Sequence, residues 1–218
     1  MDGRGLKFTI AFVAALYVEH VAELLLATNS SWAWLGIVPR TFSGLRGIIF
    51  APVLHGSWSH LLVNTGPLLI LLALLFMNRL YRPWSSLALL WLLSGFGTWL
   101  IGRGGQVHIG ASGLICALAA FLVVAAWRLR QWRAVLVAFA VVALYGGLAL
   151  AALPWTVSEH VSWESHLSGL VAGAITATRL RRPRPDPVEE VARKALAEAD
   201  RLEKMAVEVS DRQRQTRT

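Results

Sequence analysis

Four polar residues in otherwise apolar stretches could carry out chemistry together. Ser112 lies at the start of one stretch, His166 near the start of another, and His60 and Asn64 lie four residues apart in a third. A serine hydroxyl becomes a nucleophile when a neutral imidazole takes its proton, and His166 could be that base. His60 and Asn64 could donate hydrogen bonds to the oxyanion that forms when the hydroxyl attacks a carbonyl. The set predicts acyl transfer at a serine.

Glycines accompany both the serine and the base. Gly110 and Gly113 flank Ser112, where the absence of a side chain permits a tight turn and close approach of a substrate backbone. Gly169 lies one helical turn after His166 and belongs to a face of small residues. A similar face follows Ser112. Because small faces let membrane helices approach closely, we expect these two helices to pack together and bring the histidine to the serine.

The sequence favours a serine–histidine dyad without a metal or cofactor. Glu164 is two residues from His166 and is expected to point elsewhere, so no acidic residue completes a triad. A metal-dependent protease is disfavoured because the chain lacks His-Glu-x-x-His, and His55 and His60, five residues apart, do not share a helix face. Cys116 is the only cysteine, which excludes an intramolecular disulfide and a cysteine-based zinc site.

These residues lie in a chain whose composition indicates a membrane protein. Of the 218 residues, 56% are hydrophobic and 16% are charged, which excludes an ordinary water-soluble fold. About 20 apolar residues cross a bilayer as a helix, and six stretches approach that length. The sequence therefore predicts an all-α polytopic bundle of six transmembrane helices at 6–27, 58–77, 84–101, 111–127, 134–153 and 161–180.

Positive charges predict the orientation of the six helices. Most lysines and arginines near the predicted helix ends fall on one side of the membrane, and the exceptions are Arg40, Arg46 and Arg103. Because the positive side faces the cytoplasm, both termini should be cytoplasmic. The loops at 28–57, 102–110 and 154–160 should face outward, so that the candidate residues open to the outer side of the plasma membrane. The second, fourth and sixth helices then run inward and bring these residues to one depth.

The chain divides into a membrane domain at 1–180 and a charged cytoplasmic tail at 181–218. The tail holds 10 of the 21 lysines and arginines and 8 of the 13 acidic residues. Small apolar residues recur in it at alternating steps of four and three, which predicts a helix with at most a weak helix partner. The net charge of +8 reflects membrane topology, because no basic stripe indicates a nucleic-acid partner.

Together these motifs resemble the rhomboid intramembrane serine proteases. The resemblance rests on His60-Leu-Leu-Val-Asn64, on Gly110-Ala-Ser-Gly113 and on His166-Leu-Ser-Gly169, each near the start of the appropriate helix. It implies a Ser112–His166 dyad, with His60 and Asn64 holding the oxyanion. His55 matches a further family position above His60, where it would bind water. The implied substrates are single-span or polytopic proteins in the lipid bilayer.

The chain departs from the family pattern at one residue pair, and two other classes of function are alternatives to a protease. Many rhomboids carry a Trp-Arg pair in the first outer loop, where this chain reads Leu45-Arg46-Gly47. A rhomboid-like pseudoprotease would bind or escort membrane proteins without cleavage, but it should have lost Ser112 or His166. A channel or transporter is less favoured because no inverted repeat is recognisable.

Overall fold

The computed structural model describes most of the chain, and the described part is built from helices. The described residues are 3–26, 31–129, 132–150, 152–153, 162–181 and 187–215, so the predicted outer loop at 154–160 lies outside them. Within these ranges the regular elements are helices, accompanied by an isolated β-bridge between Ile37 and His108. The predicted all-α fold is confirmed. Contacts divide the chain into two units, Met1–Arg181 and Arg182–Thr218.

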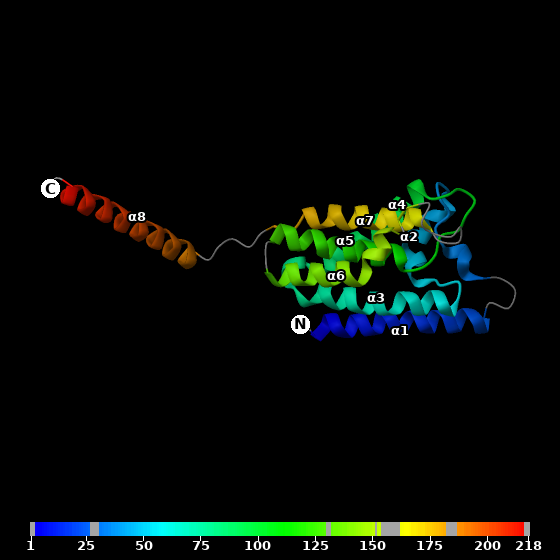
Figure 1. Cartoon of the computed structure of the whole chain (residues 1–218). Coiled ribbons are helices and arrows are strands. Elements are labelled where there is room, and N and C mark those ends of the chain that lie inside the picture. Colours follow the sequence, from blue (N-terminus) through cyan, green and yellow to red (C-terminus); the bar gives the residue numbers. More distant parts are fainter. Residues whose placement is uncertain are drawn as a thin grey trace. The chain divides into compact units, whose positions relative to one another are not determined.

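Long helices make up the described part of the first unit (Figure 1). They are α1 (Gly3–Leu26), α3 (Trp58–Met77), α4 (Pro83–Ile101), α5 (Ser112–Leu129), α6 (Trp132–Leu150) and α7 (Trp163–Thr178), with the short α2 (Gly47–Phe50) before α3. Among the described residues, α1, α3, α4 and α5 are long and apolar enough to cross a membrane. The apolar part described for α6 is shorter, at Ala134–Gly147, and α7 has 16 residues. The count of six spans stays a prediction.

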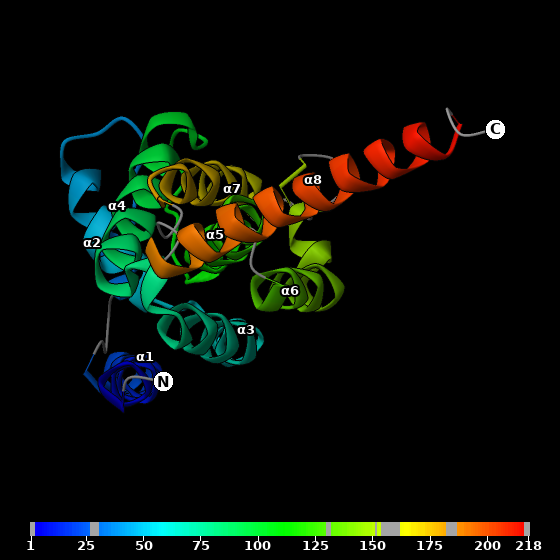
Figure 2. The same ribbon diagram turned by 90° about the vertical axis from the view of Figure 1, so that its left-hand side faces the viewer.

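Helix α5 occupies the centre of this unit (Figure 2). It packs most extensively on α7 and α6 and also contacts α3 and α4. Five of its large apolar side chains are fully buried, and they are Leu114, Ile115, Leu118, Phe121 and Leu122. Facing leucines of α3 complete the same core. The helix that begins with Ser112 therefore contacts both helices that carry the other candidate residues, α3 and α7.

Helices α5 and α7 approach closely because glycines lie at their contact. A methyl group added at Gly169 would meet the carbonyl oxygen of Gly113, and one added at Gly173 would meet that of Ala117. Backbone oxygens cannot move aside as a flexible side chain can. Residues without a side chain allow this approach between membrane helices. The predicted packing of these two segments through small residues is confirmed.

The segment at 31–57 docks on α4 through its backbone carbonyls. The indole of Trp99 donates to the carbonyl of Thr41 at 2.9 Å. Arg46, which departs from the Trp-Arg pattern, lies with its guanidinium 4.4 Å from the ring centroid of Trp34 and donates to the carbonyl of Trp34 at 2.9 Å. A tryptophan and an arginine that are separated in sequence thus meet in this segment.

The described residues of the second unit form the helix α8 (Pro187–Gln215). Ion pairs at i, i+4 spacing support it, between Lys194 and Glu190 at 2.9 Å and between Lys204 and Asp200 at 2.8 Å. Such exposed pairs each contribute a few tenths of a kcal/mol, about 0.3–0.5. Its larger apolar side chains are exposed within the unit, and they are Val188, Val191, Leu196, Leu202 and Met205.

Candidate active site

Ser112 is the first residue of α5 and is reached through a glycine turn. Gly110 has a φ of +108°, a conformation that residues with a side chain rarely adopt. Its N–H donates to the carbonyl of Ala51 at 2.8 Å, which anchors the turn. The N–H groups of a first helical turn lack partners within the helix. Ser112 therefore lies among backbone donors.

His166 lies in the first turn of α7, where Ser162 caps the helix. The Ser162 hydroxyl accepts a hydrogen bond from the N–H of Ser165 at 3.2 Å. His166 is 4% exposed, and the Gly169–Gly113 contact lies one turn further along the same face. Because glycine brings the two backbones together there, the first turn of α7 is held close to the first turn of α5.

His60 and Asn64 lie one turn apart on α3. The Asn64 amide nitrogen donates to the carbonyl of His60 at 2.9 Å, which uses one of its two hydrogens. The other hydrogen can serve a second acceptor. The His60 ring packs on Gly110, since a methyl group added to that glycine would lie 2.5 Å from the Cε1 and Nε2 atoms. Gly110 thus meets two requirements, a positive φ and room for the imidazole.

One cavity joins the four candidate residues. Its volume is about 430 Å³, and Ser112, His166, His60 and Asn64 all line it. The remaining lining is mostly apolar and consists of Val63, Pro67, Ile115, Leu144, Tyr145 and Gly147. A second cavity of about 530 Å³ shares Ser112 and His60, and more of the side chains that line it are polar, among them Ser57, Ser59, Arg103, Gln106 and Ser162.

His55 precedes α3 and packs on His60. Their ring centroids are 5.1 Å apart, and the His55 Nδ1 atom lies 3.2 Å from the carbonyl oxygen of Val53. Burial and the neighbouring His60 imidazole lower the pKa of His55 to about 4, so it is neutral at pH 7. The two rings meet although they are five residues apart, because the helix begins only at Trp58. Within the described ranges, no three His, Cys, Asp or Glu side chains could hold a metal ion.

Comparison with known proteins identifies the family. Residues 42–183 match the Rhomboid domain, and this range contains all four candidate residues. The chain belongs to the rhomboid family. It is similar to uncharacterized proteins of Mycobacterium bovis and Mycobacterium tuberculosis, each 42% identical over 180 residues, which cover 80% of this chain and 74% of the relative. An uncharacterized protein of Mycobacterium leprae is 38% identical over 181 residues, covering 80% and 70%.

Family membership and the apolar helices together make this rhomboid an integral membrane protein. Apolar side chains around its helices remain exposed within the first unit, for example Val63 on α3, Phe139 on α6 and Val171 on α7. Such a surface is suited to lipid and not to water.

Two polar contacts near the candidate site were not predicted from the sequence. The carboxylate of Glu164 is buried and points away from solvent to Arg103, with 2.8 Å between Oε1 and Nε. His108 is 5% exposed, and its Nδ1 atom lies 2.7 Å from the hydroxyl of Ser162. Burial lowers the pKa of His108. The signal for the first contact was present in the sequence, because a carboxylate in an apolar stretch requires a partner.

Proposed function

We propose that this rhomboid is an intramembrane serine endopeptidase that uses Ser112 as its nucleophile and His166 as its base. The observation that carries the proposal is the single cavity lined by both residues together with His60 and Asn64. These side chains come from three different helices. Nucleophilic attack, proton transfer and oxyanion binding must all occur around one substrate carbonyl, and a shared cavity supplies that place.

In the first half of the reaction, the Ser112 oxygen attacks the carbonyl carbon while its proton passes to His166. The tetrahedral oxyanion accepts hydrogen bonds from the free N–H of Asn64, from His60 and from N–H groups at the start of α5. The C–N bond then breaks, and His166 gives its proton to the leaving amine. An ester between Ser112 and the new carboxyl end of the substrate remains.

In the second half, water attacks the ester carbon while His166 takes a proton from it. The bond between that carbon and the Ser112 oxygen then breaks, His166 returns the proton to Ser112, and the carboxyl product leaves. The reaction requires a site for the substrate segment and access for water, and each of the two cavities suits one of these requirements. The apolar lining around the dyad accepts a membrane-spanning segment, whereas the second cavity, which also reaches Ser112 and His60 and has more polar side chains in its lining, admits water. Hydrolysis within a membrane depends on such a water-accessible depression, because polar groups and water are otherwise excluded from the hydrocarbon.

The proposal includes a topology and a class of substrate. Six helices cross the plasma membrane, with both termini and α8 in the cytoplasm, where most of the arginines near the helix ends lie. The active site then opens to the outer side. Its substrates are single-span or polytopic membrane proteins, and α8 offers a surface for at most a weak helix partner.

The decisive experiment is cleavage of a panel of single-span proteins by the detergent-purified chain. Ser112→Ala and His166→Ala should each abolish cleavage, and the double variant should lose little more, because the two residues act as a unit. Both variants should retain the thermal stability of the wild type. Cleavage that persists in Ser112→Ala would refute the assignment. Binding of substrates without cleavage by the wild type would favour the pseudoprotease.

The oxyanion role is tested on α3. Asn64→Ala should leave residual activity, since loss of one oxyanion donor costs on the order of 10²–10³ in rate. His60→Ala should behave similarly. A wild-type kcat in both variants would show that α3 does not reach the oxyanion.

A further inference from the structure

A buried ion pair joins the element that carries the base to the loop that leads to the nucleophile. The side chain of Glu164, in the first turn of α7, is 1% exposed, whereas that of Arg103 is 36% exposed. Loop 102–111, which connects α4 to α5, carries Arg103. Since a buried carboxylate is unfavourable without a counter-charge, Glu164 draws the arginine, and with it the loop, to the start of α7.

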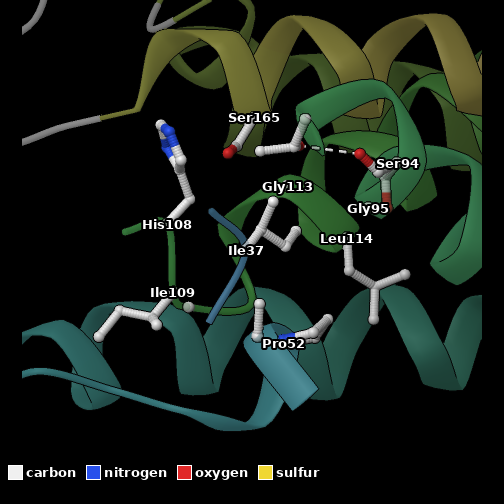
Figure 3. Close-up of a pocket in the computed structure, with 12 residues that line it drawn as sticks. Ile37, Pro52, Ser94, Gly95, His108, Ile109, Gly113, Leu114 and Ser165 are labelled. Atoms are coloured by element: carbon white, nitrogen blue, oxygen red, sulfur yellow. Dashed lines mark hydrogen bonds between the residues drawn. The ribbon is translucent and has the colours of Figure 1, made fainter. Parts of the chain in front are cut away.

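A second pair of residues makes the same connection. The Ser162 hydroxyl, which caps α7, donates to Oε2 of Glu164 at 3.3 Å and lies 2.7 Å from His108 Nδ1. His108 belongs to loop 102–111, and its backbone pairs with Ile37 in both directions, at 2.9 and 3.0 Å. Figure 3 shows His108 and Ile37 beside a pocket that Ser165 of α7 also lines.

Both ends of this network lie next to the dyad. Glu164 is two residues before His166 in the same helical turn, and loop 102–111 ends at the residue before Ser112. The glycine contact between α5 and α7 lies one turn further along and sets the spacing of the helices there. The network therefore acts on the first turn alone, where a rotation or shift would change the distance from imidazole to hydroxyl.

We propose that Arg103, His108, Ser162 and Glu164 form a latch that keeps the first turn of α7 in register with Ser112. Glu164 is then a positioning residue for the dyad, an inference that rests on the proposed function. It does not touch the substrate. Its contribution arises because a displacement of about 1 Å between reacting groups can lower the rate roughly 10²-fold.

The test uses a double-mutant cycle on the full-length protein in detergent. Glu164→Gln keeps the shape and can still accept from Ser162, while Arg103 is exposed enough to be solvated, so the fold should survive. Glu164→Gln and Arg103→Gln should each lower kcat about 10- to 100-fold. The KM should change little in both variants, and so should the melting temperature of Glu164→Gln. Arg103→Gln leaves the buried Glu164 carboxylate without its counter-charge and should melt at a lower temperature. The double variant should be no slower than either single variant, because both remove the same ion pair.

Two further measurements separate positioning from general stability. The rate at which a fluorophosphonate labels Ser112 should fall in the same ratio as kcat, because the probe needs an activated serine but no docked substrate. Arg103→Lys, which retains the positive charge, should recover part of the rate. As a matched control, Arg46→Gln removes an arginine of segment 31–57 and should leave kcat unchanged.

Several outcomes would overturn the latch. The first is a wild-type kcat in Glu164→Gln. The second is a double variant whose fold loss in kcat equals the product of the two single losses. The third is a loss of kcat that parallels the drop in melting temperature across the variants. If the wild type neither cleaves nor reacts with the probe, the proposed function fails, and amide hydrogen exchange decides on the latch by itself. In Glu164→Gln, the backbone amides of 103–111 and of 162–166 should then exchange faster than in the wild type. Unchanged exchange in these two segments would refute the latch.

Discussion

Helices α5 and α1 are both long and apolar enough to cross a membrane, yet α5 packs mainly against protein and α1 does not. In the most apolar window of α5, 61% of the residues are buried against protein, compared with 22% in α1. The contact face of α5 carries Gly113, Ala117 and Ala120, whereas α1 exposes Val18, Leu24 and Leu25. Small residues permit contact with other helices, and bulky aliphatic residues suit lipid. Apolarity alone therefore does not distinguish a central helix from a peripheral one.

This difference bears on function because the candidate nucleophile lies on the central helix. The reacting groups of the proposed site come from α3, α5 and α7, and none comes from α1. Helix α1 contacts mainly α3. Changes at the centre should alter stability and activity together, whereas changes on the periphery should alter neither.

The same substitution in both helices tests this comparison most directly. Leu118 of α5 is fully buried, and Leu25 of α1 is 72% exposed. Leu118→Ala leaves a cavity and should lower the free energy of unfolding by about 2–5 kcal/mol. Leu25→Ala should change it by less than about 0.5 kcal/mol. Equal losses, measured by denaturant titration in detergent, would mean that α1 is as tightly packed as α5.

Acidification should reveal the buried imidazole beside α3. His55 has a pKa of about 4, against 6.5 for an ordinary histidine. Between these values the unfolded chain binds a proton that the folded chain does not, so the free energy of unfolding falls as the pH drops through this window. The loss is at most about 3 kcal/mol. Unfolding titrations from pH 7 to 4 should show a shallower decline in His55→Gln, and parallel declines would contradict a neutral, buried His55.

Glycine substitutions distinguish the α5–α7 contact from an open helix face. A methyl group at Gly169 meets the Gly113 carbonyl, whereas nothing lies within 4 Å of one at Gly66 of α3. Gly169→Ala should lower the free energy of unfolding by about 1–3 kcal/mol and slow cleavage by displacing His166. Gly66→Ala should stabilise by about 0.5–1 kcal/mol, since alanine favours helices. Thermal melts and kcat measure both, and a harmless Gly169→Ala would refute the close contact.

Removal of the tail should have the smallest effect. A chain cut after Arg184 loses α8, whose contacts belong to a separate unit. We expect unchanged stability and unchanged kcat in detergent, because no described core residue is lost. The truncated and full-length proteins are compared on one substrate in detergent and in cells. A lower kcat in detergent would show that the tail supports the catalytic body, whereas a defect confined to cells would indicate a partner.

Much of the helical framework follows from local sequence. The boundaries predicted for the second helix coincide with those of α3, and the start predicted for the fourth differs from that of α5 by one residue. Apolar stretches of this kind form helices in a membrane because every backbone polar group must be bonded within its own segment. The small-residue stripes of α5 and α7 likewise predicted their contact, since close approach requires the absence of side chains.

Only the tertiary structure revealed the polar contacts that join loops to helices. Arg103 and Glu164 are 61 residues apart, and Arg46 meets Trp34 across a turn. Loop residues follow no helical period, so their spacing does not predict which side chains meet. His55 contacts His60 because the chain bends before Trp58, and Glu164 is buried on α7, which packs against α4 and α5. Local propensity determines each helix, but the pairing of charges depends on distances that exist only after the helices have packed.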